Sequence, residues 1–142
     1  MKSYTDIEQS KKLAEILPLE SADTWWAERY AGQVMPNGQY IVNEKPVYYL
    51  SLTKPSNDNY SQDTVKDIPC WSLAALLSII PQEIFDGEYV INITEGCDNK
   101  WILTYDHYKN KNHSFYGLSS GADNLIDVCY ELIIKLKERN LL

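Results

Sequence analysis

Apolar residues recur at three- and four-residue steps near the C-terminal end of the chain. The positions are Leu125, Ile126, Cys129, Leu132, Ile133 and Leu136. This spacing is typical of one face of an α-helix, and charged residues such as Asp127 and Lys135 take the other side. Asp123 is placed to cap the first turn, and basic residues gather in the last turn, where the helix dipole favours cations. The pattern predicts a helix over residues 122–139 whose apolar stripe packs on a sheet.

Two further segments carry helix signals. Thr5 and Glu8 have the spacing of a capping box, and the apolar stripe that follows predicts a helix over residues 5–17. Ser72 is placed as the N-cap of a helix over residues 72–80, which has little polar surface and should be mostly buried. A proline follows each of these two segments and ends it.

The remaining segments read as strands separated by turns. Strand-forming residues are concentrated in the ranges 23–30, 39–43, 47–52, 88–94, 100–108 and 113–118. Pro36-Asn37-Gly38 has turn chemistry, and the polar stretch 53–66 is expected to be a long surface loop. All strand links after residue 87 are as short as hairpins, which parallel strands cannot use. We therefore predict an α+β fold: an antiparallel sheet of about five strands with the helices packed on it.

Composition indicates one globular domain over residues 1–142. The chain has 44% hydrophobic and 12% aromatic residues, which excludes a disordered protein. No apolar run approaches the length of a membrane span, and the first residues lack the apolar core of a signal peptide. Three widely spaced cysteines fit reduced thiols better than a disulfide framework. We expect a cytoplasmic protein that does not associate with membranes.

The charge balance argues against nucleic-acid binding. Twenty acidic and 13 basic residues give a net charge of −7, and no cluster of Lys and Arg is longer than a pair. The acidic residues are scattered among bases, as on a solubilising surface. An acidic mimic of nucleic acid would require these acids to form a linear array, and it stays an alternative.

Cys97, His107 and His113 are the one grouping of soft metal ligands to test. A hairpin centred on Asn110 would place His107 opposite His113, bringing the two imidazoles together. Cys97 lies in the turn at the opposite end of the same strand, and no closely spaced Cys or His pair completes a site. We predict a cross-strand polar pair with no metal.

Cys70 precedes a helix whose amides are able to lower a thiol pKa. Catalysis also needs a general base, and both histidines are distant in sequence. The predicted role is packing beneath Trp71, and Cys129 is expected in the core. The chain has no dinucleotide-binding or phosphate-binding glycine motif and no nucleophile elbow, so no cofactor is predicted.

Aromatic residues are concentrated in the N-terminal half, as Trp25, Trp26, Tyr30, Tyr48 and Tyr49. Adjacent residues on a strand point to opposite faces, so Trp25-Trp26 and Tyr48-Tyr49 should each leave one ring outward. Exposed Trp and Tyr are enriched at protein interfaces. These five residues are the predicted binding patch.

Two segments resemble a group of short uncharacterised proteins from gut Bacteroides, their phages and other mobile elements. They are Pro69-Cys-Trp-Ser-Leu-Ala-Ala-Leu-Leu-Ser-Ile-Ile-Pro81 and Ala122-Asp-Asn-Leu-Ile-Asp-Val-Cys-Tyr-Glu-Leu-Ile-Ile-Lys-Leu136. The opening stretch, from Lys11 to Asp23, is similar to the same group. The group has no assigned activity, so the resemblance implies a mobile-element context and gives no residue a role.

The leading functional hypothesis is a small non-enzymatic binding or accessory protein that acts by protein–protein contact, with a homodimer as its simplest form. A small enzyme built on Cys70, or on His107 and His113, is the alternative from a different class.

Overall fold

The computed structural model describes residues 2–29, 32–42, 45–52 and 67–142. Its helices are α1 (Ile7–Ile16), α2 (Leu73–Ile79) and α3 (Leu125–Glu138), with short 3₁₀ turns at Leu19–Ser21 and Tyr116–Leu118. All strand pairs in the described part of the chain are antiparallel. The predicted α+β class is confirmed.

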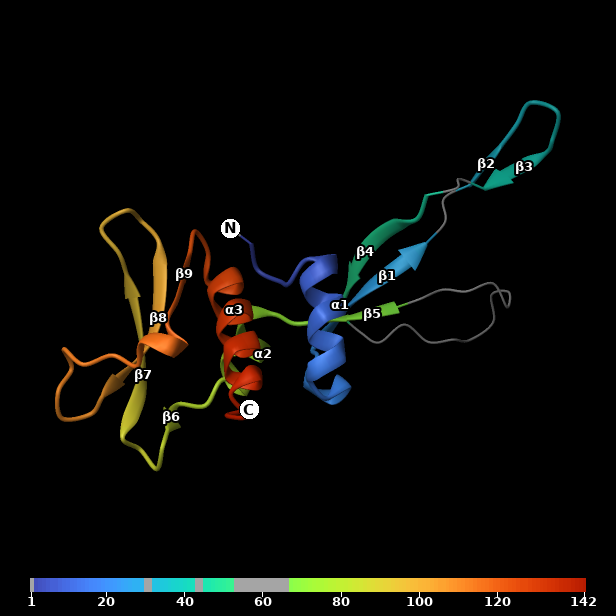
Figure 1. Cartoon of the computed structure of the whole chain (residues 1–142). Helices are drawn as coiled ribbons and strands as arrows, with labels where there is room; N and C mark the ends of the chain where they lie inside the picture. The colour runs from blue at the N-terminus through green and yellow to red at the C-terminus, as the bar shows by residue number, and fades with distance from the viewer. Residues whose placement is uncertain (1, 30–31, 43–44, 53–66) are drawn as a thin grey trace.

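One half of the molecule is a four-stranded sheet packed against α3. Its strand order is β6-β7-β8-β9, in which every strand is a sequence neighbour of the next. The bounds are β6 Glu83–Ile84, β7 Tyr89–Glu95, β8 Trp101–His107 and β9 Ser120–Ala122. Figure 1 shows α3 (red) beside this sheet, with α2 adjoining it.

The other half begins at α1 and extends away from the core. A three-stranded sheet has the order β4-β1-β5, and a separate two-stranded sheet pairs β2 with β3. The bounds are β1 Thr24–Arg29, β2 Gly32–Val34, β3 Tyr40–Val42, β4 Val47–Ser51 and β5 Asp67–Cys70. In Figure 1 the β2–β3 hairpin lies at the far end, remote from all three helices. We call the described residues between 24 and 52 the β-arm.

The hydrophobic core lies between α3, α2, α1 and the four-stranded sheet. The predicted stripe of α3 is confirmed, because Ile126, Cys129, Leu132, Ile133 and Leu136 are fully buried. They pack with the other core residues, which include Leu13, Trp71, Leu76, Leu103, Tyr105 and Leu118. No residue of the β-arm belongs to this cluster of buried apolar residues.

Two predicted helix caps are displaced by one residue. Asp6, and not Thr5, caps α1, and it forms the capping box with Gln9. Asn124, and not Asp123, caps α3. In the first case Thr5 is buried and its hydroxyl is engaged elsewhere, so the next residue with a suitable side chain takes the cap position. Ser72 caps α2 as predicted.

The strands are distributed differently from a single sheet of about five. Within the predicted strand 113–118, only Ser114 forms a bridge, to Asp106, and the chain then turns through Tyr116–Leu118 before forming β9. Four short strands lie outside the ranges predicted as strand: β2, β5, β6 and β9. Each is two to four residues long, too short for an alternation of apolar and polar residues to be visible. The predicted loop 53–66 lies outside the described residues.

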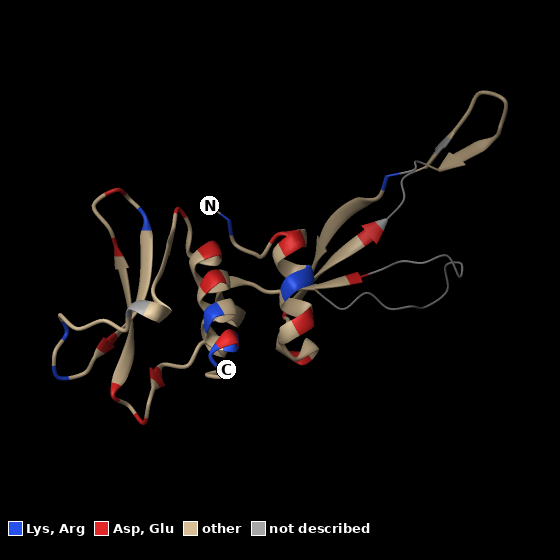
Figure 2. Cartoon of the chain, in the orientation of Figure 1, with Lys and Arg blue, Asp and Glu red and all other residues tan. Residues whose placement is uncertain are grey.

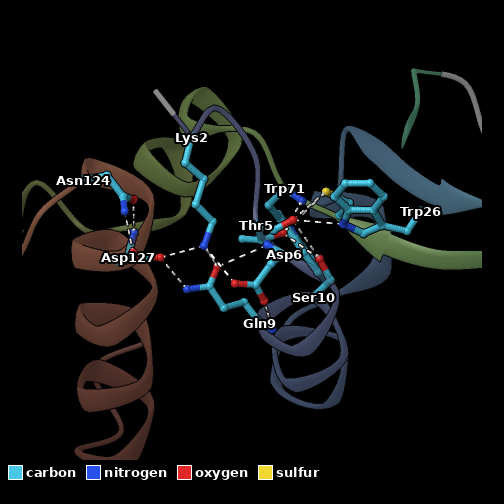
Figure 3. A network of polar contacts seen from close by, with 10 residues as sticks. Lys2, Thr5, Asp6, Gln9, Ser10, Trp26, Trp71, Asn124 and Asp127 are labelled. Atoms are coloured by element: carbon cyan, nitrogen blue, oxygen red, sulfur yellow. Dashed lines mark hydrogen bonds and ion pairs between the residues drawn. The ribbon is translucent and has the colours of Figure 1, made fainter. Parts of the chain in front are cut away.

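Thr5 joins the start of α1 to β1 and to the β5–α2 junction. Its backbone N–H donates to the Trp71 carbonyl at 3.0 Å, and its hydroxyl accepts from the Trp71 N–H at 3.1 Å. The same hydroxyl lies 2.7 Å from that of Ser10, and the Thr5 carbonyl accepts from the Trp26 indole at 2.9 Å. Thr5 is fully buried, so these bonds replace water at every polar group it carries. Figure 3 shows the side chains that converge on it.

Lys2 joins α1 to α3 beside this junction (Figure 3). Its ammonium group donates to Asp6 at 2.9 Å, to Gln9 at 2.7 Å and to Asp127 at 2.7 Å. Partial burial by itself would raise the pKa of the Asp127 carboxyl, but bonds from Lys2, Gln9 and Asn124 outweigh it and lower that pKa below 3.8. Burial likewise opposes the charged form of Lys2, yet its bonds to Asp127 and Asp6 raise its pKa above 10.5. We call these two sets of contacts together the N-terminal junction.

Replacing Leu132 by Ala should destabilise the protein by about 2–5 kcal/mol, because a fully buried side chain leaves a cavity in a packed core. The free energy of unfolding in urea measures this effect. Leu19→Ala is the control, since Leu19 is 57% exposed and its truncation should change stability by less than about 0.5 kcal/mol. Equal stabilities of the two variants would contradict the placement of α3 in the core.

Asp127→Asn should weaken the protein at neutral pH by about 1 kcal/mol, because a charge-assisted contact is lost at a partly exposed site. A carboxyl whose pKa is lowered on folding contributes stability that is present above pH 3.8 and is lost as the pH falls below it. The variant should therefore lose less stability than the parent between neutral pH and pH 3. Urea titrations at several pH values measure this slope, and Asp98→Asn, at an exposed turn position, should leave it unchanged.

Candidate functional site

The described residues of the predicted aromatic patch lie on β1 and β4 of the arm. Trp26 stands opposite Leu50, and Glu28 opposite Tyr48. Ala27 stands opposite Tyr49, so Tyr49 shares the face of Trp25, and Tyr48 shares the face of Trp26. The rings therefore divide between the two faces of the sheet, and Tyr30 lies outside the described residues.

The face of Trp26 is tied to the body of the protein. Trp26 is half-buried, and its indole N–H reaches the Thr5 carbonyl at the N-terminal junction. Tyr48 is also half-buried, and its hydroxyl donates to the Glu28 carboxylate at 3.1 Å. The Trp26 ring therefore holds β1 to the N-terminal junction, and the Tyr48 ring joins β4 to β1.

The opposite face leaves an aromatic ring in solvent. Tyr49 is 56% exposed, while its neighbour Trp25 is half-buried. The small residue Ala27 lies between the positions of these two rings and is itself buried. Of the described predicted residues, Tyr49 is the one available to contact a partner.

Most exposed large apolar side chains of the described structure belong to the β-arm. They are Val34, Tyr40, Ile41, Val42, Val47, Tyr49, Leu50 and Leu52. The others, such as Val90 and Tyr108, are spread over the remaining described residues, which we call the body. Exposed apolar groups concentrated on one element are typical of an interaction surface. This surface extends beyond the predicted patch, to the hairpin at the end of the arm.

The end of the arm is shaped by two glycines. Gly38 adopts φ of +80° in the predicted Pro36-Asn37-Gly38 turn, and the Gly38 N–H donates to the Met35 carbonyl. Across the hairpin, a Cβ on Gly32 would lie 2.1 Å from the Tyr40 hydroxyl oxygen. The absent side chain therefore leaves the Tyr40 ring room to lie against the backbone of β2.

The sequence segment that contains the β-arm, residues 24–52, has no net charge. Between residues 24 and 52 the acids Glu28 and Glu44 are balanced by Arg29 and Lys45, and residues 32–42 contain no charged side chain. The net charge of −7 therefore belongs to the rest of the chain. Figure 2 shows acidic and basic residues on α1, on α3 and on the four-stranded sheet, while the β2–β3 hairpin carries neither.

The predicted binding patch does not include the exposed hairpin residues Val34, Tyr40, Ile41 and Val42. The reason is that the sequence analysis does not predict the pairing of β2 with β3. The available signal was the Asn37-Gly38 turn, which is a strong indicator of a hairpin. Apolar residues at three consecutive positions of β3 then indicate that both faces of the hairpin are apolar.

His107 and His113 lie opposite each other, in the register of a hairpin centred on Asn110. The His107 N–H donates to the His113 carbonyl at 2.9 Å, and the ring centroids are 6.4 Å apart. The Nδ1 atom of His107 accepts the backbone N–H groups of Lys109 and Asn110, so this ring nitrogen is engaged in the turn. A cavity of about 260 Å³ adjoins the pair, lined also by Glu88, Tyr89 and Asn110. No group of three His, Cys, Asp or Glu residues within the described ranges is arranged to hold a metal.

The cysteines do not form a reactive centre with the histidines. Cys70 is fully buried and contacts the Thr5 hydroxyl and carbonyl at 3.5 Å. Cys129 is in the core as predicted, and burial raises the pKa of its thiol to about 12. Cys97 is exposed in the turn between β7 and β8.

A wider hollow of about 460 Å³ lies between the N-terminal segment and α3. Lys2, Asp6, Gln9 and Asp127 line it, and they are already bonded to one another. These contacts make one wall of the hollow part of the junction that holds α1 to α3.

No protein-family model, curated protein or solved structure matches this chain. Among the described residues, no helix is long and apolar enough to cross a membrane.

The two faces of the arm should respond differently to truncation. Trp26→Ala removes a half-buried ring and its bond to Thr5, and it should destabilise the protein by about 2 kcal/mol. Tyr49→Ala removes an exposed ring and should change stability by less than about 0.5 kcal/mol. Thermal and urea unfolding of both variants check this contrast, and a large loss for Tyr49→Ala would mean that its ring packs within the monomer.

Proposed function

We propose that this protein is a non-enzymatic binding or accessory protein that acts by protein–protein contact through the β-arm. The observation that carries the proposal is the concentration of exposed apolar residues on a projection without net charge, in a chain whose net charge is −7. Apolar contact area with exposed aromatic residues is characteristic of protein interfaces. Following the resemblance to proteins of mobile elements, we propose a host or element protein as the partner.

Two properties of the arm favour a protein partner over a small ligand. The exposed residues lie on a projecting surface of paired strands, whereas small-molecule sites are usually concave. The strands also offer backbone hydrogen-bonding groups at their edges, which another chain is able to pair with.

The alternative of a cysteine- or histidine-dependent enzyme has less support. Cys70 is fully buried beside Thr5, and the His107–His113 pair lies on the four-stranded sheet of the other half. Nucleophilic catalysis needs the thiol and its base within hydrogen-bond reach of each other.

The proposal is tested by capturing partners from a bacterial lysate with the immobilised protein and with two matched variants. Tyr49→Ala removes a ring of the arm that is 56% exposed. Tyr108→Ala is the matched control, because it removes a ring of the body that is 54% exposed. Proteins that bind through the arm should be retained by the parent and by Tyr108→Ala, and lost at least several-fold with Tyr49→Ala. A set of retained proteins that is identical for both variants would refute the proposal.

A further inference from the structure

We infer that the end of the β-arm pairs edge to edge with the same segment of a second copy of this chain, through β3. This inference rests on the proposed function, since it names a partner for the same arm. Its basis is the combination of an incomplete sheet, an outward-facing strand edge and a neutral apolar composition.

The β2–β3 hairpin is an incomplete sheet. Each of its strands has one neighbour in the described structure, and all three residues of β3 are exposed. Tyr40 and Val42 point to one face and Ile41 to the other. All three are exposed, so among the described residues neither face of the hairpin is covered by a helix or by another sheet. An isolated two-stranded hairpin is at best marginally stable in water, and additional strands stabilise it.

The hydrogen-bonding pattern shows which backbone groups are turned outward. The Met35 N–H donates to the Gln39 carbonyl, so Met35 and Gln39 form a hydrogen-bonded pair across the hairpin. Ile41 lies two residues after Gln39 on the same strand and stands opposite Gln33. Because hydrogen-bonded pairs alternate in an antiparallel ladder, the backbone groups of Ile41 face β2. Those of Tyr40 and Val42 face the open edge of the hairpin.

A two-fold axis through Ile41 makes this edge complementary to itself. Antiparallel pairing of two β3 strands about that axis places Tyr40 of each copy opposite Val42 of the other. The outward N–H and carbonyl groups of these two residues then pair with each other. Aromatic rings beside β-branched residues are favourable cross-strand neighbours, and a closed two-fold contact uses the same surface on both subunits.

Charge favours a second copy over a partner selected by opposite charge. A basic partner would be drawn to the acidic body, because residues 32–42 carry no charge to attract it. The hairpin lies remote from the three helices, so pairing at its edge brings two neutral segments together. The two bodies, each part of a chain of net charge −7, then need not approach each other closely.

The test is the oligomeric state of the purified full chain, measured by sedimentation and light scattering over a range of concentrations. The parent should show twice the mass of a single chain of 16.4 kDa. Ile41→Lys places two ammonium groups together on the axis and should shift the dissociation constant at least tenfold toward monomer. Val90→Lys is the matched control at a body position, since Ile41 and Val90 are 43% and 41% exposed, and it should leave the dimer intact.

Two further measurements separate strand pairing from other modes of association. The Tyr40 and Val42 amides should become protected from hydrogen exchange as concentration rises, because they are the ones turned outward. Added salt should strengthen the dimer, since it screens the repulsion between two acidic bodies and the interface holds no ion pair to weaken.

A parent chain that stays monomeric up to about 1 mM overturns this inference. So does a dimer that survives Ile41→Lys, or one that is lost with Val90→Lys and therefore forms through the four-stranded sheet. Each of these three results is distinguishable from failure of the proposed function, because capture of other proteins is scored with Tyr49→Ala and not with Ile41→Lys.

Discussion

The arrangement of the molecule depends on the burial of Thr5 at the meeting point of its two halves. Thr5 is fully buried, and its backbone and hydroxyl bond to Trp71, Ser10 and Trp26, which belong to different elements. A buried polar group without a partner costs about 1–3 kcal/mol, so each of these bonds constrains the position of an element. Lys2 adds the link from α1 to α3. Among the described residues, no buried side-chain nitrogen or oxygen lacks a hydrogen-bond partner.

This junction holds the base of the β-arm and leaves its end without a core. The Trp26 face is anchored at Thr5, whereas the hairpin beyond it contributes no residue to the core cluster. In the described part of the chain, the β2–β3 hairpin is held by the pairing of its two strands, and its residues Val34, Tyr40, Ile41 and Val42 are exposed. A contact with another protein chain would bury these residues and extend the sheet. If the proposed function is right, repulsion between two acidic bodies would favour a contact at the arm, which has no net charge.

Local patterns in the sequence predicted the parts of the fold in which burial and periodicity coincide. The helix over α3, the N-cap Ser72 and the pairing of His107 with His113 all follow from spacings within a few residues. The α1 cap did not follow, because Thr5 and Asp6 are both acceptable caps in isolation. The choice between them was made by Trp71, which lies far away in sequence and engages the Thr5 hydroxyl.

The sequence by itself determined the class of fold, the buried stripe of α3 and the presence of aromatic residues on strands near the N-terminus. It also determined that residues 32–42 are uncharged. Only the tertiary structure decided that Trp26 is used as an anchor while Tyr49 remains in solvent, because alternation along a strand does not say which face meets the body. It likewise decided that the strands of the described residues divide into three sheets and that the β2–β3 hairpin projects from the core. Short strands carry too few residues to specify their partners, and those partners are chosen by contacts between segments that are distant in the chain.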